Sequence, residues 1–149
     1  MSSNRSPITT NVWLALFPIT FAIHFAEEFW CGEGYPAYLF RLRGVELSVE
    51  RFVAFQIMGF VLFVASGVIS RYLKFPEFMI AVLGLIVLSN GLSHSVTALW
   101  DGGYGPGLFS SIFLWIPLGV LSIAFMFGRI SHKRLATATL TGFAINGIF

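Results

Sequence analysis

Residues 12–30 read VWLALFPITFAIHFAEEFW, an apolar run with one histidine and two glutamates in its second half. A helix of roughly 20 residues crosses the hydrocarbon core of a bilayer, which is about 30 Å thick. Three further runs have similar length and character. We therefore predict membrane spans at about 12–30, 52–72, 78–100 and 108–127.

The composition of the 149-residue chain agrees with these spans. Hydrophobic residues make up 56% of the chain and charged residues 11%, with a mean hydropathy of +0.82. A soluble domain carries about 25% charged residues, so this chain is expected to lie in a lipid bilayer. A net charge of +2, from scattered basic residues, argues against a nucleic-acid partner. We predict an all-α fold, a multi-pass transmembrane bundle of four to five spans forming one membrane domain over residues 1–149.

Two segments have more than one interpretation. Residues 135–149 are apolar but number only about 15, so they form a short tilted span, which we favour, an interfacial helix or a truncated one. Residues 31–51 mix aromatic and charged side chains and are too long for a turn. They indicate an interfacial segment that could act as a lid, or else a plain amphipathic loop helix.

The basic residues predict the orientation of the spans, because cytoplasmic loops retain an excess of Lys and Arg. On the side of the N-terminus lie Arg5, Arg71, Lys74, Arg129, Lys133 and Arg134. On the other side lie Arg41, Arg43 and Arg51. We therefore expect a cytoplasmic N-terminus in a multi-pass protein of the inner cell membrane.

Prolines mark a helix start and two kinks. Pro76 precedes Glu77 and is expected at the first turn of a span. Pro18 and Pro117 fall inside spans, where a missing N–H predicts a kink.

The first span carries three ionisable residues, each of which is costly inside a bilayer. At 100° per residue, His24, Glu27 and Glu28 share one helix face. The third span offers a counterpart, because Asn90 and His94 are one turn apart. His24 and Asn90 each lie about 18 Å from the cytoplasmic start of their span.

Further polar residues are expected near the same level, in the outer leaflet. Gln56 lies in the first turns of the second span, and Ser110 and Ser111 begin the fourth. The glycine-rich loop between the third and fourth spans brings Asp101 and Tyr104 to the mouth of this polar pocket, unless it is a simple turn. We therefore predict one shared polar site, with Asn90, Gln56 and Asp101 contacting a substrate or supporting the central residues.

Three short motifs resemble those of the HXXEE-domain family of small bacterial integral membrane proteins. HFAEE at residues 24–28 matches HxxEE, NGLSH at 90–94 matches NxxxH, and YGPG at 104–107 matches YxPG. The resemblance covers the first four spans. The resemblance supports the assignment of the polar site and implies that Tyr104 belongs to this site. It implies no particular activity.

Two imidazoles and a carboxylate form the ligand set of zinc enzymes and non-haem iron oxygenases. We predict one divalent metal, Zn or Fe, bound by His24, Glu28 and His94, with Glu27, Glu28 and Tyr104 as candidate catalytic groups. The substrate would be a lipid-soluble small molecule, and the enzyme a membrane hydrolase, isomerase or oxygenase. A metal-free acid–base mechanism is the other form of this hypothesis.

A different class of function also fits the histidines. His24 and His94 could ligate haem or another pigment in an accessory subunit of a larger membrane complex, and a homo-oligomer is equally compatible with the sequence. Ion transport is disfavoured, because no chain of ionisable groups crosses to the cytoplasmic side.

Overall fold

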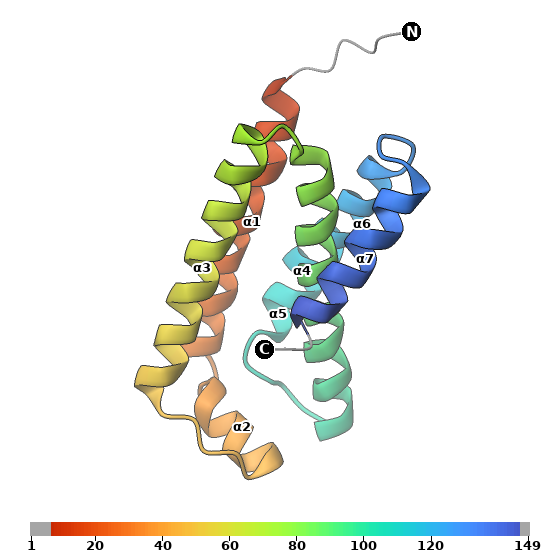
Figure 1. Cartoon of the computed structure of the whole chain (residues 1–149). Coiled ribbons are helices and arrows are strands. Elements are labelled where there is room, and N and C mark those ends of the chain that lie inside the picture. Colours follow the sequence, from red (N-terminus) through yellow and green to blue (C-terminus); the bar gives the residue numbers. More distant parts are fainter. Residues whose placement is uncertain (1–6, 147–149) are drawn as a thin grey trace, which may run out of the picture.

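The computed structural model describes residues 7–146, and in that range the only regular secondary structure is helical (Figure 1). Four helical stretches are long and apolar enough to cross a membrane, which confirms the predicted all-α class. They are Thr10–Trp30, Val49–Tyr72, Pro76–Asp101 and Leu108–Met126. The predicted bounds lie within three residues of these, because lipid thickness sets the length of each apolar run.

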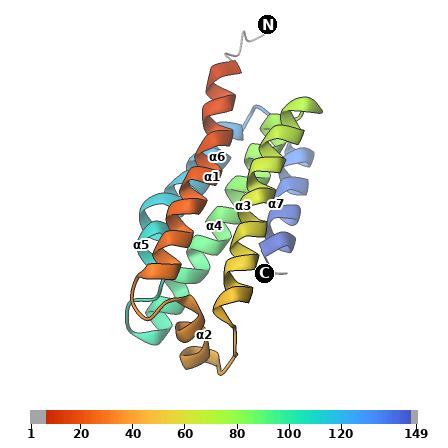
Figure 2. The ribbon, with the colours of Figure 1, turned by 90° about the vertical axis from the view of Figure 1, so that its left-hand side faces the viewer.

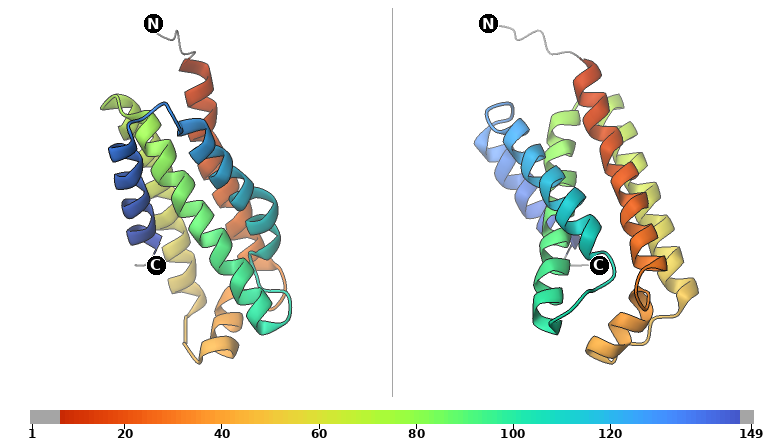
Figure 3. Two further views of the ribbon diagram at one scale, coloured as in Figure 1. Left: turned by 90° about the vertical axis from the view of Figure 1, so that its right-hand side faces the viewer. Right: turned by 180° about the vertical axis from the view of Figure 1, so that it is seen from behind.

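The first three spanning stretches lie in single helices, and the fourth is composite. The single helices are α1 (Pro7–Trp30), α3 (Val49–Tyr72) and α4 (Pro76–Asp101). The fourth stretch joins α5 (Leu108–Ser110), a π-helical turn η1 (Ser111–Trp115) and α6 (Ile116–Met126). Successive stretches run in opposite directions (Figures 1 and 3).

The helix termini follow local rules that the sequence predicts. Pro76 is the first residue of α4 and Glu77 lies in its first turn, as expected. Ser48 caps α3 by accepting a hydrogen bond from the backbone N–H of Arg51. Pro18 lies inside α1, and Pro117 is the second residue of α6, separated from the π-helical turn by Ile116. A π-turn is one of the devices by which a helix accommodates an interrupted hydrogen-bond ladder.

Helix α4 is central, with α1 and α3 on one side and α6 and α7 (His132–Asn146) on the other (Figures 1 and 2). Small residues let α4 and α6 approach closely. A Cβ atom added at Gly119 would lie 2.6 Å from Leu88 Cβ and 2.7 Å from the Gly84 carbonyl oxygen. Packing of this kind is how helices associate in lipid, where the hydrophobic effect between helices is weak.

Helix α7 corresponds to the predicted fifth run. It begins at His132 and its 15 residues extend to Asn146, while residues 147–149 lie outside the described part of the chain. Fifteen helical residues rise about 22 Å, less than the hydrocarbon thickness. Gly142 packs against Leu85 and Val82 of α4, so α7 lies along that helix. A fifth complete span stays a prediction.

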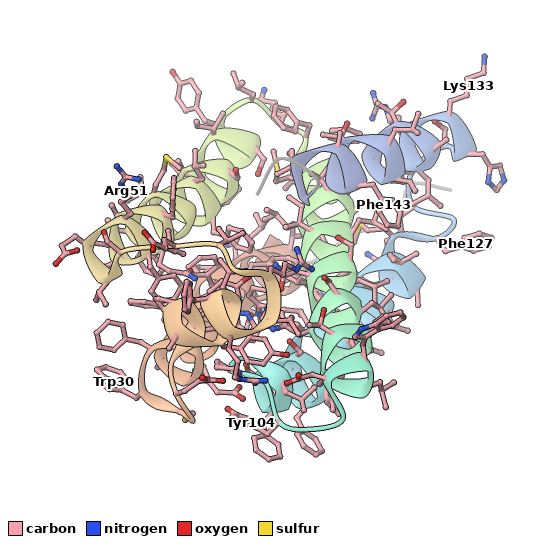
Figure 4. The ribbon with its side chains drawn as sticks, turned by 90° about the horizontal axis from the view of Figure 1, so that it is seen from below. Trp30, Arg51, Tyr104, Phe127, Lys133 and Phe143 are labelled. Atoms are coloured by element: carbon pink, nitrogen blue, oxygen red, sulfur yellow. The ribbon has the colours of Figure 1, made fainter. Side chains whose placement is uncertain are left out.

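Helix α2 (Tyr35–Arg43) lies across the end of the bundle opposite the N-terminus (Figure 1). Figure 4 views the molecule from this side, where Trp30 and Tyr104 also lie. We call this the α2 end of the bundle. It holds α2, the loop 102–107 and the outer turns of α1, α3 and α4.

Candidate metal centre

Three side chains from α1 and α4 meet inside the α2 end of the bundle. Glu28 Oε1 lies 3.6 Å from His24 Nε2 and 3.3 Å from His94 Nε2. One ligand atom from each residue lies within 4.8 Å of the others. His24 is 2% exposed and Glu28 4% exposed, and His94 is partly buried. A buried carboxylate between two imidazoles needs a compensating positive charge, from a proton or a metal ion.

The hydroxyl of Ser110 contacts the Nδ1 nitrogen of His24 and so bears on its tautomer. Ser110 Oγ lies 3.2 Å from the carbonyl oxygen of Gly107, to which it donates its single proton. The same oxygen lies 2.7 Å from His24 Nδ1, and with the hydroxyl proton directed at the Gly107 carbonyl, Nδ1–H is the donor of this bond. This hydrogen-bond network assigns the imidazole proton to Nδ1 and leaves an electron pair on Nε2.

The tautomer makes the inner side of the cluster suitable for a cation. His24 Nε2 and Glu28 Oε1 then face each other as two electron-pair donors, at a distance longer than a normal hydrogen bond. Tetrahedral zinc bonds of about 2.0–2.2 Å separate neighbouring ligand atoms by about 3.4 Å. The contacts of Glu28 with both histidines agree with that separation. The donor set therefore fits a divalent ion, with the two imidazoles closing further around it.

Gln56 of α3 holds the other oxygen of the Glu28 carboxylate, through a hydrogen bond from its Nε2 to Oε2. Glu28 Oε1 is thereby left to the histidines. Outer hydrogen bonds of this kind orient metal ligands and tune their basicity.

Aromatic packing orients the imidazole of His24. The Trp115 ring stacks on it with centroids 3.7 Å apart and planes 25° apart. The ring of His94 meets His24 edge-on, with centroids 4.9 Å apart. Trp115 ends the π-helical turn η1, and such turns are frequent at functional sites.

Gly107 closes the cluster from the loop side. Its φ of +88° lies in the left-handed region. An added Cβ atom would lie 2.8 Å from His24 Cε1, 2.9 Å from His94 Cε1 and 3.1 Å from Glu28 Cγ. Both the backbone conformation and the space therefore require glycine here.

The second glutamate of the first span makes different contacts from its neighbour. Glu27 Oε1 accepts hydrogen bonds from the Tyr104 hydroxyl and the Phe109 N–H, both at 2.8 Å, and Oε2 accepts one from the Ser110 N–H at 2.6 Å. The two N–H groups begin α5, so the carboxylate caps this helix from α1. Burial and the hydrogen bond to Glu27 raise the pKa of Tyr104, which keeps its hydroxyl a donor.

Two other predicted site residues lie outside the cluster. Asp101 accepts two hydrogen bonds from the Arg41 guanidinium, at 2.9 and 3.1 Å, and so fastens α2 to the end of α4. Asn90 lies one turn below His94 on α4, and its buried Oδ1 has no hydrogen-bond partner in the described structure. Neither residue contacts Glu28 in the hydrogen bonds and ion pairs of the described chain.

Sequence reasoning missed the supporting roles of several residues. Ser110 is recognisable as a polar residue at the start of a span, but its bond to His24 depends on how α1 and α5 meet. Trp115 looks like any aromatic residue of a span, and no sequence signal separates Arg41, which pairs with Asp101 and Glu33, from Arg43.

A family described as "protein of unknown function with HXXEE motif" matches residues 15–122. The chain belongs to this HXXEE family. No curated protein and no solved structure matches the chain.

The structure shows what the residues of each HXXEE-family motif contact in this chain. The four-residue spacing in HxxEE turns His24 and Glu28 toward one side of α1, while Glu27 reaches the start of α5. NxxxH brings His94 to the cluster, one turn above Asn90. YxPG supplies a hydroxyl for Glu27 and the glycine that packs against all three clustered side chains.

Proposed function

We propose that the chain is a metal-dependent membrane enzyme whose divalent ion is held by His24, Glu28 and His94 and whose substrate is a small lipid-soluble molecule. The observation that carries the proposal is the bond of His24 Nδ1 to Ser110, because it leaves Nε2 as an electron-pair donor aimed at the buried Glu28 carboxylate. Three protein ligands leave an open position, as in catalytic zinc and non-haem iron sites.

The bound ion would act as a Lewis acid, or lower the pKa of a water molecule so that hydroxide forms near neutral pH. The chain's own residues have separate roles in this proposal. Gln56 orients Glu28, Ser110 orients His24, and Trp115 fixes the plane of the His24 ring.

Glu27 and Tyr104 are proposed as positioning residues. All three donors around the Glu27 carboxylate come from Tyr104 and the start of α5, so Glu27 holds the segment that carries Ser110. Three of the four acceptor positions of its carboxylate are taken, which suits a positioning role better than general-base catalysis. In a metal-free acid–base enzyme, by contrast, Glu27 or Glu28 would move the proton itself.

The packing around the histidines favours an ion over a haem or another pigment. A macrocycle needs open space beside its axial imidazole, whereas Gly107 and Trp115 lie directly against His24. The proposed location is the inner cell membrane, with the N-terminus in the cytoplasm and the metal centre in the outer leaflet.

Elemental analysis of the protein purified in mild detergent tests the proposal. We expect one zinc or iron ion per wild-type chain and less than a tenth of that in His24→Ala, Glu28→Gln and His94→Ala. His132→Ala is the matched control, because it removes an imidazole at the start of α7, outside the cluster. Metal-free wild-type protein that cannot be loaded with zinc or iron would overturn the metal centre. A haem-like absorption band from the purified protein would instead support the hypothesis that the histidines bind a pigment.

A further inference from the structure

A cleft of 220 Å³ lies between α2 and the outer turns of α4, beside the candidate metal centre. His94 belongs to both, since it lines the cleft and contacts Glu28. A water molecule occupies about 30 Å³ of liquid, so the cleft has the volume of about seven waters. It can hold a small polar group but not a whole lipid.

Two residues of the cleft wall have buried polar atoms that lack a hydrogen-bond partner within the described chain. They are Tyr38, through its hydroxyl, and Asn90, through Oδ1. Buried polar atoms are normally satisfied, so such atoms beside a cleft indicate partners supplied by a ligand or by water. Asn90 Oδ1 can only accept, and a ligand hydroxyl would provide the donor that it lacks.

The cleft also has a cation on its wall. Arg41 is paired with Glu33 and Asp101, whereas Arg43, two residues further along α2, makes no ion pair with any carboxylate of residues 7–146. An unpaired guanidinium is suited to a phosphate or a carboxylate, which it can bind through two parallel hydrogen bonds. The polar group in the cleft is therefore expected to be an anion.

The apolar side chains of the cleft and its position along α4 both indicate that it opens toward the lipid bilayer. Leu39 and Leu42 line it together with the polar residues. His94 is six residues from Trp100, a highly exposed aromatic residue of the kind found at membrane interfaces. Six helical residues rise about 9 Å, which brings the cleft to the boundary between head groups and acyl chains.

We propose that this cleft binds the head group of an anionic lipid that carries at least one free hydroxyl group. Arg43 contacts the anion, Asn90 accepts from the hydroxyl, and the acyl chains leave past Leu39 and Leu42 into the bilayer. The inference rests on the proposed function in one respect, because it makes this lipid the substrate held beside the metal centre.

Calorimetric titration of the full-length protein in detergent tests the proposal with three probes. They are short-chain phosphatidylglycerol, which is anionic and hydroxylated, short-chain phosphatidylcholine, which is neither, and free glycerol phosphate. We expect phosphatidylglycerol to bind at least about tenfold more tightly than the other two. Arg43→Gln and Asn90→Leu should each weaken that binding by about tenfold, since each removes a hydrogen bond to the head group.

Arg51→Gln is the matched control, because it removes the same charge at the same end of the bundle but outside the cleft. Its affinity should equal that of the wild type. Equal binding of the two lipids, an equal loss in Arg51→Gln, or glycerol phosphate binding as tightly as the lipid would each overturn the proposal. Gel filtration and circular dichroism of each variant show whether it is folded, and Asn90→Ser supplies a smaller change at the same position.

The two proposals fail separately. Glu28→Gln removes a metal ligand but leaves the cleft wall intact, so phosphatidylglycerol should still bind to it within about threefold of wild type. Selective lipid binding by wild-type protein that cannot be loaded with zinc or iron would sustain the cleft and overturn the metal centre. Metal binding without selective lipid binding would sustain the metal centre and overturn the proposed lipid site.

Discussion

Gly107 packs against His24 so closely that a Cβ atom at position 107 would lie 2.8 Å from His24 Cε1. The contact joins the loop between α4 and α5 to the buried end of α1. It explains why a residue without a side chain stands at the wall of the cluster, and it gives the candidate metal centre its most sensitive position.

Gly107→Ala is expected to abolish metal binding, because the methyl group would displace both imidazoles and Glu28. The left-handed backbone alone costs a residue with a side chain about 1–2 kcal/mol. Gly102→Ala has a similar φ of +73° and nothing within 4 Å of the added Cβ, so it controls for this cost. Metal content per chain is the measurement. Equal metal content in the two variants would show that the close approach of Gly107 to the cluster is not required for metal binding.

Ser110→Ala is expected to weaken zinc affinity by about 10- to 100-fold, since it removes the group that fixes the His24 tautomer. Ser111→Ala is the control in the next position. Its hydroxyl is also buried but has no partner in the described structure. Competition with a zinc-binding dye measures both affinities. If both serine variants bind zinc like the wild type, the Ser110 hydroxyl does not orient His24 for metal binding.

Glu27→Gln and Glu28→Gln are expected to differ although the residues are neighbours. Glu27→Gln places an amide NH₂ against N–H donors and should destabilise the fold by about 1–3 kcal/mol. Glu28→Gln should retain more stability but lose the metal. Thermal unfolding in detergent and elemental analysis, on the same preparations, separate the two roles. The same pattern of effects in both variants would refute this division.

Gly119→Ala tests the close contact between α4 and α6. The added methyl group would overlap Leu88 and the Gly84 carbonyl, so we expect a fall of several degrees in the unfolding temperature. In Gly67→Ala the nearest atom is Leu14 Cβ at 3.8 Å, an ordinary contact. That variant should be neutral or slightly stabilised, by up to about 1 kcal/mol from helix propensity. Unfolding at the wild-type temperature in Gly119→Ala would show that the helices can separate at no cost.

The helical spans were predictable because one physical quantity, the thickness of hydrocarbon, sets the length of each apolar run. The four stretches of the structure agree with the predicted bounds to within three residues. The face that His24 and Glu28 share was predictable as well, since residues four apart in a helix stack on one side. For α7, whose described part is too short for a complete span, length alone does not decide the role.

The partners of the polar residues were less predictable. The sequence suggests one pocket for all of them, but the described contacts form three groups. Glu28 joins the two histidines and Gln56, Glu27 joins Tyr104 and the start of α5, and Asp101 joins Arg41. These pairings depend on how helices from distant parts of the chain approach one another.

The sequence by itself determined the all-helical class, the four spanning lengths and the face of α1 that carries His24, Glu27 and Glu28, because these follow from hydrophobicity and helical period. Only the tertiary structure decided which glutamate meets the histidines and which caps α5. Consecutive residues of a helix point 100° apart, so Glu27 and Glu28 point in different directions. Which side chains each of them contacts depends on how the other helices pack against α1. The contact of His24 Nδ1 with Ser110 and the place of Arg43 on the cleft wall, away from the carboxylates of residues 7–146, follow from the same packing.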